Sequence, residues 1–377
     1  MKVAFVLGAS NYRLALYRAT IDTASELRKS GIEVDYIFWE YPGDLQGNDQ
    51  YIPIFGLSKE KKASKWFLKF FSSILGRHFY YFLFSRFFSA QLYNRLNAKD
   101  YSAIFFHGMS CIPMHKGVGD EYIIVHSCKA ENLLGKLSGI KRIFYRKIYQ
   151  RIYSDKNLLS VSKDVSRDML TGIGASPKTI GEIYNGFNFA RLKSAMQAPC
   201  SARLPEAYIM SAGRPDRTKR FDLLIDAYSK TKKTYPLVIF GDGRKLSALK
   251  QQAAELGLSD KVIFPGFCSD LLGAYRNAVL YVSSSDVEGL PTVVVESLVS
   301  GTPVVATDAG GSNELLAGRL SKWIVRRGDV DGLAKAIDEI LLEPPEVSEN
   351  DISFLDYRAV AGTYADCVYR KMERSSG

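Results

Sequence analysis

Short apolar runs alternate with amphipathic stretches along most of the chain. Residues 2–7 (KVAFVL) and 33–39 (EVDYIFW) are predicted strands, because each run is short, apolar and rich in β-branched or aromatic residues. Between them, residues 13–31 have the apolar spacing of a helix that ends at Gly31. Further strands are predicted at residues 102–108, 122–127, 158–162, 207–213, 236–243, 261–267, 280–282 and 302–307. Strands that alternate with helices favour parallel, doubly wound sheets, so we predict an α/β fold.

The length of the chain favours two domains. At 377 residues, of which 46% are hydrophobic, the sequence can fill two cores of ordinary size. An Asn-Gly pair typical of a turn ends at Gly186, and Pro199 and Pro205 follow it. We therefore predict a first domain over residues 1–186, with residues 187–205 as the linker region into the second.

The stretch from Leu280 to Leu316 combines two predicted strands with two polar loops. A helix is predicted between the strands, starting at Pro291, since a first helical residue does not use its N–H, and ending at Gly301. The first loop holds Glu288, and Glu296 follows eight residues later, inside the helix. Eight residues is slightly more than two helical turns, so Glu296 is expected to face the same general side as the loop.

Positive charge is concentrated in the first half of the chain. Residues 1–185 hold 26 Lys and Arg against 16 Asp and Glu, whereas residues 186–377 hold 24 of each, so the whole net charge of +10 belongs to the first half. A basic surface can bind nucleic acid, an anionic membrane surface or a phosphorylated substrate. Net charge alone does not choose among them.

Residues 59–100 combine nine of these basic residues with many aromatic ones. Eleven Phe, Tyr and Trp side chains lie between Trp66 and Phe88, and Trp66, Phe70 and Ile74 fall on one helical face. One interpretation is a buried helical hairpin packed on the sheet. The other, which we favour, is a basic amphipathic helix at an anionic membrane surface. Binding of single-stranded nucleic acid is disfavoured, because no nucleic-acid motif accompanies the stretch.

The cysteines and histidines show no metal-binding spacing. Five cysteines are scattered singly without a CxxC pair, and none is spaced with the four histidines as metal ligands are. We expect a protein of the reducing cytoplasm without structural zinc. The N-terminal apolar run has the length of a strand and is unlike a signal peptide, and no run approaches the roughly eighteen apolar residues of a membrane span.

Polar residues follow several predicted strands, at the carboxyl ends where open α/β sheets bind ligands. His107 and His126 each end a strand of the first domain, either as groups placed for chemistry or as hydrogen-bonded structural residues. In the second domain, residues 214–220 hold four basic side chains before a helix, which suits a diphosphate or a solvated surface loop. Residues 8–11 (GASN) lack G-x-G-x-x-G, and form either an ordinary turn or a contact to acceptor or phosphate.

An ordered set of motifs in the second domain carries a family resemblance. Glu288 and Glu296 are the only Glu-x7-Glu pair in the chain. The rest of the set is Arg214, Lys219, Gly241-Asp242-Gly243, Phe264-Pro265-Gly266, Gly301-Thr302-Pro303-Val304 and Gly310-Gly311. This order resembles retaining glycosyltransferases of the two-Rossmann (GT-B) fold, family 4 type, also described as glycosyl transferases group 1. The first domain shows three weaker similarities to the family. One is a histidine that ends a strand, and the other two are the segments LLSVS and YNGF.

The resemblance implies a nucleotide-sugar donor, a UDP-sugar being favoured, bound mainly by the second domain. Arg214 and Lys219 would bind the diphosphate and stabilise its charge as it leaves. Glu288 would lie near the donor sugar, Glu296 would accept hydrogen bonds from the ribose, and His126 would hydrogen-bond the transferred sugar. Further donor-binding positions are Gly241, Phe264, Gly266 and Phe267 around the base, Gly289, Leu290, Pro291 and Thr292 near phosphate and sugar, and the backbone donors of Gly310 and Gly311.

The resemblance also implies a division of labour between two Rossmann-like domains that face each other across a cleft. The expected parts are an acceptor domain (residues 1–186), a donor domain (187–355) and a helix that crosses back to the first domain (356–377). Acceptor contacts are expected at Gly8, Asn11 and His107. The acceptor would be lipid-linked or a glycan, in bacterial surface-polysaccharide or lipopolysaccharide biosynthesis, and the protein peripheral on the inner face of the cell membrane. No cofactor is expected, because the nucleotide sugar is a substrate.

Some positions depart from the family pattern. The usual Gly-Phe-Gly after the first glutamate is replaced by Gly289-Leu290-Pro291, and a Gly-Gly pair is missing from residues 8–11. Asp329-Val330-Asp331 resembles the metal motif of a different glycosyltransferase fold. It precedes a predicted helix, so we interpret it as a helix N-cap and infer no metal.

Competing functions differ in class. A nucleotide-sugar epimerase of the same architecture would need no acceptor, and a non-catalytic sensor of nucleotide sugars would need no catalysis. A nicotinamide-dependent dehydrogenase is disfavoured by the missing G-x-G-x-x-G. No carboxylate is placed as a nucleophile, so we expect attack on the donor's same face, assisted by the leaving diphosphate.

Overall fold

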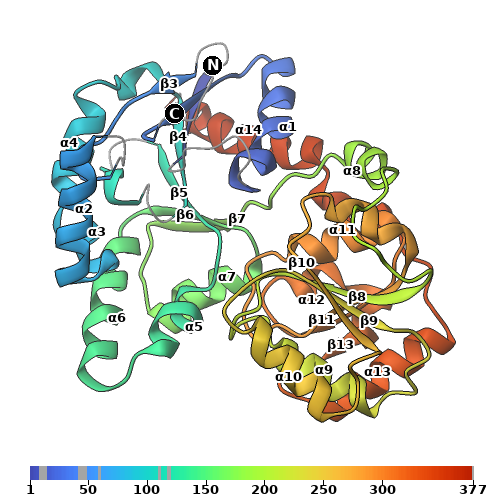
Figure 1. Ribbon diagram of the computed structural model, residues 1–377. Coiled ribbons are helices and arrows are strands. Elements are labelled where there is room, and N and C mark those ends of the chain that lie inside the picture. The colour runs from blue at the N-terminus through green and yellow to red at the C-terminus, as the bar shows by residue number, and fades with distance from the viewer. Residues whose placement is uncertain (8–14, 41–48, 58–60, 109–111, 117–119, 376–377) are drawn as a thin grey trace. The chain divides into compact units, whose positions relative to one another are not determined.

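The computed structural model describes residues 1–7, 15–40, 49–57, 61–108, 112–116 and 120–375. The chain forms two compact units, the N-terminal unit (Met1–Phe187 with Leu355–Gly377) and the C-terminal unit (Asn188–Phe354). Each unit has one parallel sheet with helices packed on it (Figure 1). The predicted α/β class with two Rossmann-like domains is confirmed.

The N-terminal unit contains a seven-stranded parallel sheet in the order β3-β2-β1-β4-β5-β6-β7. Its strands are β1 (Lys2–Leu7), β2 (Glu33–Phe38), β3 (Gln50–Tyr51), β4 (Ala103–His107), β5 (Glu121–Val125), β6 (Asn157–Ser160) and β7 (Thr179–Glu182). Every residue of β4 is buried, because a central parallel strand has helices on both faces. This burial explains why its sequence is apolar up to the final His107 instead of alternating.

Helices of the N-terminal unit include one from the far end of the chain. They are α1 (Ala15–Lys29), α2 (Lys62–Leu75), α3 (Arg77–Leu83), α4 (Ser85–Tyr93), α5 (Lys129–Leu133), α6 (Gly139–Tyr153), α7 (Lys163–Arg167) and α14 (Tyr357–Ser375), with short helical turns η1 (Ala98–Asp100), η2 (Ile112–Met114), η3 (Leu134–Lys136) and η4 (Asp168–Ile173). Tyr364 of α14 packs on Phe5 and Phe105, with ring centroids 5.1 and 4.9 Å away. The last helix therefore belongs to the core of the first sheet.

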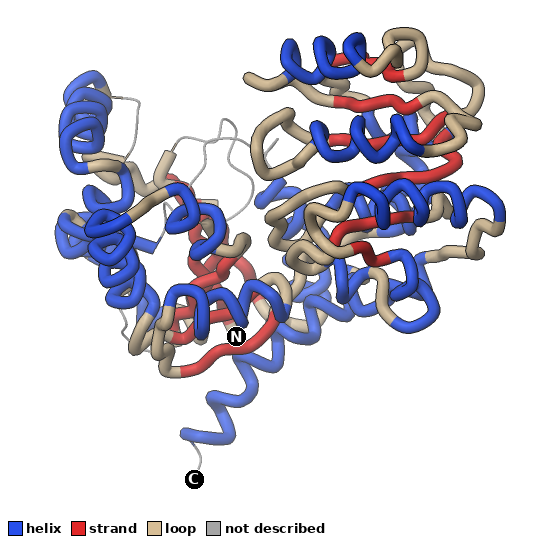
Figure 2. The backbone as a smooth tube through the Cα atoms, turned by 90° about the horizontal axis from the view of Figure 1, so that it is seen from below, coloured by secondary structure: helices blue, strands red, loops and turns tan. Residues whose placement is uncertain are grey.

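The C-terminal unit contains a six-stranded parallel sheet in the order β10-β9-β8-β11-β12-β13. Its strands are β8 (Tyr208–Ala212), β9 (Leu237–Phe240), β10 (Val262–Gly266), β11 (Ala278–Ser283), β12 (Val304–Thr307) and β13 (Ile324–Val325). Its helices are α8 (Phe189–Met196), α9 (Phe221–Lys230), α10 (Leu246–Glu255), α11 (Thr292–Ser300), α12 (Ser312–Leu315) and α13 (Val330–Leu342), with turns η5 (Leu271–Asn277), η6 (Gly318–Trp323) and η7 (Glu349–Leu355). Figure 2 shows the helices layered on both faces of this sheet, which is doubly wound.

The observed elements differ from the predicted ones at four of the described places. Residues 187–205, predicted as a linker, contain α8, whose start is capped by the Asn188 side chain accepting from Arg191 N at 3.0 Å. The helix predicted to start at Pro291 begins one residue later, with Pro291 as its N-cap. β3 and β13 were not predicted, because two-residue strands are too short to show a hydrophobic period.

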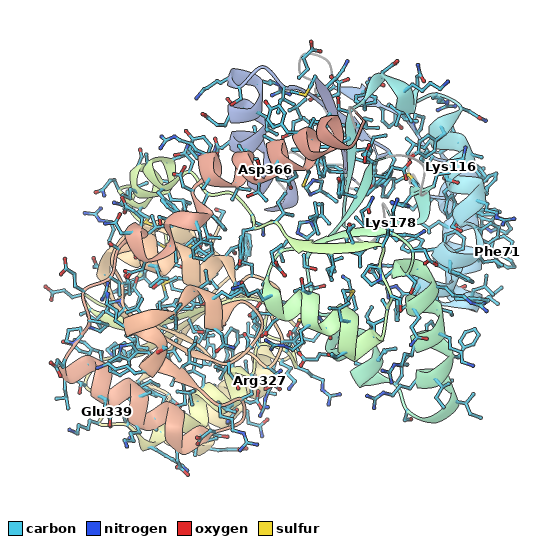
Figure 3. All side chains as sticks on the ribbon, turned by 180° about the vertical axis from the view of Figure 1, so that it is seen from behind. Phe71, Lys116, Lys178, Arg327, Glu339 and Asp366 are labelled. Carbon is cyan, nitrogen blue, oxygen red and sulfur yellow. The ribbon has the colours of Figure 1, made fainter. Side chains whose placement is uncertain are left out.

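The aromatic stretch around residues 59–100 forms α2, α3 and α4, and its side chains divide between two environments. Tyr80, Phe88 and Leu92 are fully buried in the core of the N-terminal unit, and Tyr80 O–H donates to Gly56 O at 2.6 Å. Figure 3 labels Phe71 on α2, whose ring is only partly buried. Trp66 and Ile74 are 61% and 65% exposed. The interpretation as a buried helical hairpin therefore accounts for the buried side chains of α2, α3 and α4, but not for the exposed ones. Among the described residues, no helix is both long and apolar enough to cross a bilayer.

Candidate functional site

The carboxyl edge of the six-stranded sheet gathers most of the predicted site residues of the C-terminal unit. All strands are parallel, so the loops that follow them meet at one edge. Backbone hydrogen bonds join these loops: Asp286 N donates to Thr218 O at 2.8 Å, and Gly311 N to Gly289 O at 2.8 Å. Arg327, which follows β13, donates to Asp286 O at 3.0 Å (Figure 3). The edge is therefore one connected structure and not a set of separate loops.

Lys219 and Glu288 form an ion pair at the centre of this edge. Lys219 Nζ lies 2.6 Å from Glu288 Oε1, and the same oxygen accepts a hydrogen bond from Ser285 Oγ at 2.7 Å. Both charged side chains are largely but not fully shielded from water, with 22% and 12% of their surface exposed. A cation held this way is pre-positioned, and enough of it stays accessible for an incoming anion.

The loop from Arg214 to Arg220 is folded around Asp216. Its Oδ1 accepts from Thr218 N at 2.9 Å and from Lys219 N at 3.3 Å, which fixes the backbone that carries the Lys219 side chain. Burial alone would raise the pKa of Asp216, but these hydrogen bonds outweigh it and leave the pKa below the ordinary value. Asp216 is therefore an ionised organiser of the loop.

The other basic residues of this loop are held differently. Arg214 is 78% exposed in its side chain and has only a 3.3 Å contact from Nε to Asp216, so it is the freest of the cations described here. Arg220 pairs with Asp222 and Asp286 at 3.1 and 3.0 Å. Two carboxylates on one guanidinium make Arg220 a structural residue. Arg217 is exposed, so it remains beside Arg214 and Lys219 as a cation that can meet a ligand.

Two glycines of this edge are required by close backbone approach. Gly310 has φ 56°, and a Cβ there would lie 2.5 Å from Glu288 O. Gly241 has φ 134°, and a Cβ there would lie 1.8 Å from Gly213 O. Both positions therefore accept only glycine without a shift of the backbone. They hold the loops after β8, β9, β11 and β12 against one another.

The amino end of α11 points its first N–H groups toward the loop that carries Glu288. Leu290 and Pro291 are buried, and the helix begins at Thr292. The first N–H groups of a helix lack partners within the helix and carry partial positive charge, which favours an anion. Because Pro291 has no N–H, the free donors start at Thr292.

Glu296 is fixed by a residue that sequence reasoning missed. Tyr275 of η5 donates to Glu296 Oε2 at 3.2 Å and lies 3.0 Å from Val293 O. Burial, and then the charge of Glu296, hold the Tyr275 pKa well above its ordinary value, so the phenol keeps its proton and can donate. Tyr275 lies in a run predicted only as a helix, and no motif singled it out.

The expected base-binding positions lie at the end of β10. Phe264 and Gly266 belong to the strand and are partly buried, whereas Phe267 is 79% exposed. An aromatic ring left uncovered at the ligand edge of a sheet offers a stacking surface for a planar base.

The predicted residues of the N-terminal unit lie at the carboxyl edge of the other sheet. β4 ends at His107 and β5 ends just before His126, and the two ring centroids are 5.7 Å apart. His107 is buried and neither of its ring nitrogens has a hydrogen-bond partner in the described part of the chain. His126 keeps some exposed surface, but its Nε2 is buried and also unpartnered among the described residues. Gly8 and Asn11, the other expected acceptor contacts, lie outside the described residues.

Both imidazoles are neutral at physiological pH. Burial, followed by the neighbouring His126, pushes the pKa of His107 well below its ordinary value. Burial, followed by the charge of Lys129, lowers the pKa of His126 to about 3. Each ring is therefore available as one donor and one acceptor, and neither is a resident cation.

Among the described residues, the fold brings together three side chains of metal-ligand type that the sequence pattern did not indicate. Cys200, Cys268 and Asp270 have ligand-type atoms that all lie within 4.8 Å of one another, and the two Sγ atoms are 3.1 Å apart. They come from the start of the C-terminal unit and the loop after β10, so no short motif could reveal them. The Asp329 carboxylate accepts from Gly332 N at 2.8 Å, which confirms the predicted N-cap.

Comparison with known proteins shows that part of the chain matches a family model. Residues 198–352 match the family model described as "Glycosyl transferases group 1". One relative is the N-acetylgalactosamine-N,N'-diacetylbacillosaminyl-diphospho-undecaprenol 4-alpha-N-acetylgalactosaminyltransferase of Campylobacter jejuni, 27% identical over 51% of this chain and 53% of the relative. Another is the lipopolysaccharide core biosynthesis glycosyltransferase LpsE of Rhizobium meliloti, 34% identical over 44% of this chain and 48% of the relative. The chain thus spans about half the length of these curated relatives.

Solved structures resemble the whole chain. Sucrose-phosphate synthase from Thermosynechococcus elongatus has a TM-score of 0.70 at 17% identity, covering 99% of both chains. Anabaena Alr3699/HepE in complex with UDP has a TM-score of 0.64 at 16% identity, covering all of both chains. At such identities the likeness shows the fold. The chain therefore has the GT-B fold, and its C-terminal unit contains a segment that matches the glycosyl transferases group 1 model.

Proposed function

We propose that this protein is a retaining glycosyltransferase that uses a nucleotide-sugar donor, a UDP-sugar being favoured, in bacterial surface-polysaccharide biosynthesis. The single observation that carries the proposal is the Lys219–Glu288 pair, 2.6 Å apart at the carboxyl edge of the sheet within the segment that matches the family. The names of relatives that build lipopolysaccharide and polyprenyl-linked sugars support the pathway. A neighbouring structure solved with UDP supports the donor.

In this proposal the donor diphosphate binds among Arg214, Lys219 and the first N–H groups of α11. Arg214 grips two phosphate oxygens, and Lys219 supplies a point charge that Glu288 keeps in place. As the sugar leaves, negative charge grows on the diphosphate and these groups stabilise it. Glu296, oriented by Tyr275, accepts hydrogen bonds from the ribose. No metal is needed to neutralise the diphosphate.

The transferred sugar is assigned to His126 and Glu288. A neutral imidazole with an unpartnered Nε2 can hydrogen-bond a sugar hydroxyl without bringing a charge that would oppose the developing oxocarbenium ion. The acceptor hydroxyl then attacks the face that the diphosphate leaves. The departing oxygen takes up the proton of the acceptor, and no glycosyl-enzyme forms.

The acceptor is proposed to be lipid-linked, and α2 to dock the protein on an anionic membrane. Trp66, 61% exposed, stacks on Phe70 of the same outer face with ring centroids 5.0 Å apart. Lys65 and Lys69 are exposed on the same helix. Exposed aromatics flanked by lysines suit the interface of a bilayer.

A donor panel tests the activity. Purified protein is incubated with UDP-, GDP- and ADP-sugars without acceptor, and thermal shift and release of nucleoside diphosphate are recorded, since a bound donor raises apparent stability. We expect one UDP-sugar to stabilise the protein and to be hydrolysed slowly, with EDTA having no effect. Conversion of the sugar with the nucleotide still attached would instead identify an epimerase. Stabilisation by no nucleotide sugar would contradict the proposal.

Flotation with vesicles tests the membrane part. The protein should float with phosphatidylglycerol vesicles at low salt and not with phosphatidylcholine vesicles, because the attraction of lysines is electrostatic. The variant Trp66→Ser/Phe70→Ser should lose most of this binding. The matched variant Phe267→Ser, which removes an exposed aromatic from the C-terminal unit, should bind like the wild type.

A further inference from the structure

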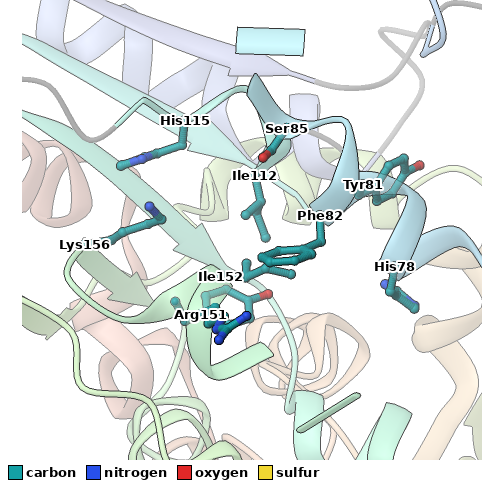
Figure 4. Close-up of a pocket in the computed structure, with 10 residues that line it drawn as sticks. His78, Tyr81, Phe82, Ser85, Ile112, His115, Arg151, Ile152 and Lys156 are labelled. Carbon is teal, nitrogen blue, oxygen red and sulfur yellow. The ribbon is translucent and has the colours of Figure 1, made fainter. Parts of the chain in front are cut away.

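The N-terminal unit contains a cavity of about 100 Å³ that takes no part in the proposed reaction (Figure 4). It lies among α3, the start of α4, η2 and the end of α6. Lys156, at one side of it, immediately precedes β6, at the amino edge of the sheet. His107 and His126 lie at the carboxyl edge of the same sheet, so the cavity is separate from the predicted acceptor contacts.

The polar side chains that line the cavity share one property, which is that none of them is an acid. All can donate a hydrogen bond, and the serine, the tyrosines and the imidazoles can also accept one. They are His78, Tyr81, Ser85, His115, Arg151, Tyr153 and Lys156. The rest of the wall is aromatic and aliphatic, with Phe82 and Ile152 facing the polar groups in Figure 4. A wall of donors that lacks a carboxylate is complementary to an anion.

Two of these groups are buried without a partner. Tyr153 is fully buried, and neither its hydroxyl nor His115 Nε2 has a hydrogen-bond partner in the described part of the chain. His115 Nδ1 lies 3.5 Å from Glu121 Oε2, so that side of the ring faces away toward the sheet. Buried polar groups are nearly always hydrogen-bonded in folded proteins, so an unpaired donor pair beside a cavity points to a ligand that pairs them.

The wall of the cavity has two cations, Arg151 and Lys156. Arg151 and Lys156 form no ion pair within the described ranges. Burial lowers the pKa of Lys156, even though Glu121 and Asp155 act in the opposite direction. Burial likewise lowers the pKa of His115 to about 3, with the charge of Lys156 adding to the effect. Lys156 is therefore a partly desolvated cation beside the exposed Arg151, and an anion in the cavity would offset its charge.

We propose that this cavity is a binding site for a phosphate group. A phosphate has several acceptor oxygens, so it can take hydrogen bonds from Arg151, Lys156 and the buried donors at once, where a halide ion could take them from only one point. The apolar part of the wall suits the carbon skeleton of a phosphate ester. The phosphate could come from a lipid headgroup or from a free phosphate compound.

The neighbouring surface makes the lipid source testable. Phe79 of α3 contacts Phe144 of α6 with ring centroids 5.4 Å apart, and Leu83, which follows the lining residue Phe82, is 54% exposed. An apolar rim next to a phosphate site is what a short-chain phosphatidic acid would use, and inorganic phosphate would not.

Binding is measured by isothermal titration calorimetry on the full chain with inorganic phosphate, and in parallel with monomeric dihexanoyl phosphatidic acid. We expect saturable 1:1 binding that Lys156→Gln weakens by about tenfold or more, the usual effect of losing one charge-assisted hydrogen bond. Lys136→Gln, an exposed lysine of the same unit, should bind like the wild type. Tighter binding of the phosphatidic acid identifies a lipid source, and equal binding a free phosphate.

Two results would overturn the proposal: no saturable binding of either probe, or binding that Lys156→Gln and Lys136→Gln weaken equally. If Lys156→Gln does not fold by circular dichroism, Arg151→Gln, exposed at its position, replaces it. Donor hydrolysis without acceptor serves as an independent readout, since it tests the proposed function and should be unchanged in Lys156→Gln.

Discussion

The carboxyl edges of the two sheets have the same topology and opposite chemistry. In the C-terminal unit, Lys219 and Glu288 are charged, partly accessible and paired at 2.6 Å. In the N-terminal unit, the ends of β4 and β5 carry the imidazoles of His107 and His126, which are neutral and have unpaired buried nitrogens among the described residues. At the C-terminal edge, Lys219 and Glu288 thus already form an ion pair before any ligand binds. At the N-terminal edge, the buried imidazole nitrogens have no hydrogen-bond partner among the described residues.

This difference fits two different ligands. A diphosphate is an anion that needs preorganised positive charge, and preorganisation means that the protein has little to rearrange when charge develops. A sugar or acceptor hydroxyl is neutral and needs donors and acceptors without charge. The comparison predicts that loss of the Lys219 cation at the first edge acts mainly on catalysis, and that loss of the His107 imidazole at the second edge acts on stability.

The largest effect is expected from Lys219→Met. In the proposed function Lys219 stabilises the leaving diphosphate, so its loss should lower kcat by about a hundredfold or more, measured as turnover of the preferred nucleotide sugar. The matched control is Lys230→Met, which removes an exposed pair with Asp331 at 2.6 Å in the same unit and should leave kcat unchanged. If both variants kept wild-type turnover, the paired edge would be structural only.

Gly310→Ala should have the next largest effect, on folding. The new Cβ would meet Glu288 O at 2.5 Å in a backbone with φ 56°, so unfolding in urea should show a loss of about 2 to 3 kcal/mol. Gly301→Ala separates the two causes. It has φ 84° with no atom within 4 Å, so it should lose only about 1 kcal/mol. Equal losses would mean that the approach of the loops is not what requires glycine.

Much of this architecture could be predicted from the sequence, because buried strands and helix ends have recognisable residue patterns. Buried parallel strands such as β9 are continuous apolar runs, so they are easy to recognise in the sequence. The turn and glycine signals around α11 located that helix to within one residue. The ordered motifs also placed Lys219 and Glu288 in one family pattern. Their direct pairing needs the fold, because 69 residues separate them.

Other features could not be predicted from local pattern. Tyr275 gains its role only because η5 carries it to Glu296. The pairing of Cys200 with Cys268 joins positions 68 residues apart. The aromatic stretch has a buried and an exposed side because only some of its residues contact Gly56 and the first sheet. The spacing of its apolar residues predicted a helix but not which helical face is buried.

Acid should destabilise the N-terminal edge more than the C-terminal one. The pKa of His107 is depressed in the folded state, so the folded chain stays neutral while the unfolded chain takes up a proton below about pH 6.5. Its contribution to stability is complete above that pH and is lost as the pH falls toward the folded pKa. The slope should be about 1.4 kcal/mol per pH unit for one such group. Urea unfolding of wild type and His107→Leu between pH 7 and about pH 5 measures it. Parallel curves for the two proteins would contradict the prediction.

The smallest effect is expected for the same variant near pH 8. There the imidazole is neutral in both states, and the remaining cost is that of two buried nitrogens without partners. Replacing a buried polar group that has no hydrogen bond by an apolar side chain is neutral or stabilising, so His107→Leu should raise the free energy of unfolding by up to about 1 kcal/mol. Glu288→Leu at the other edge should lower it instead, because it leaves Lys219 partly buried without its partner. Opposite signs at the two edges would show that one is built from satisfied charges and the other from unsatisfied donors, and a loss at both would mean that His107 has a partner in solution.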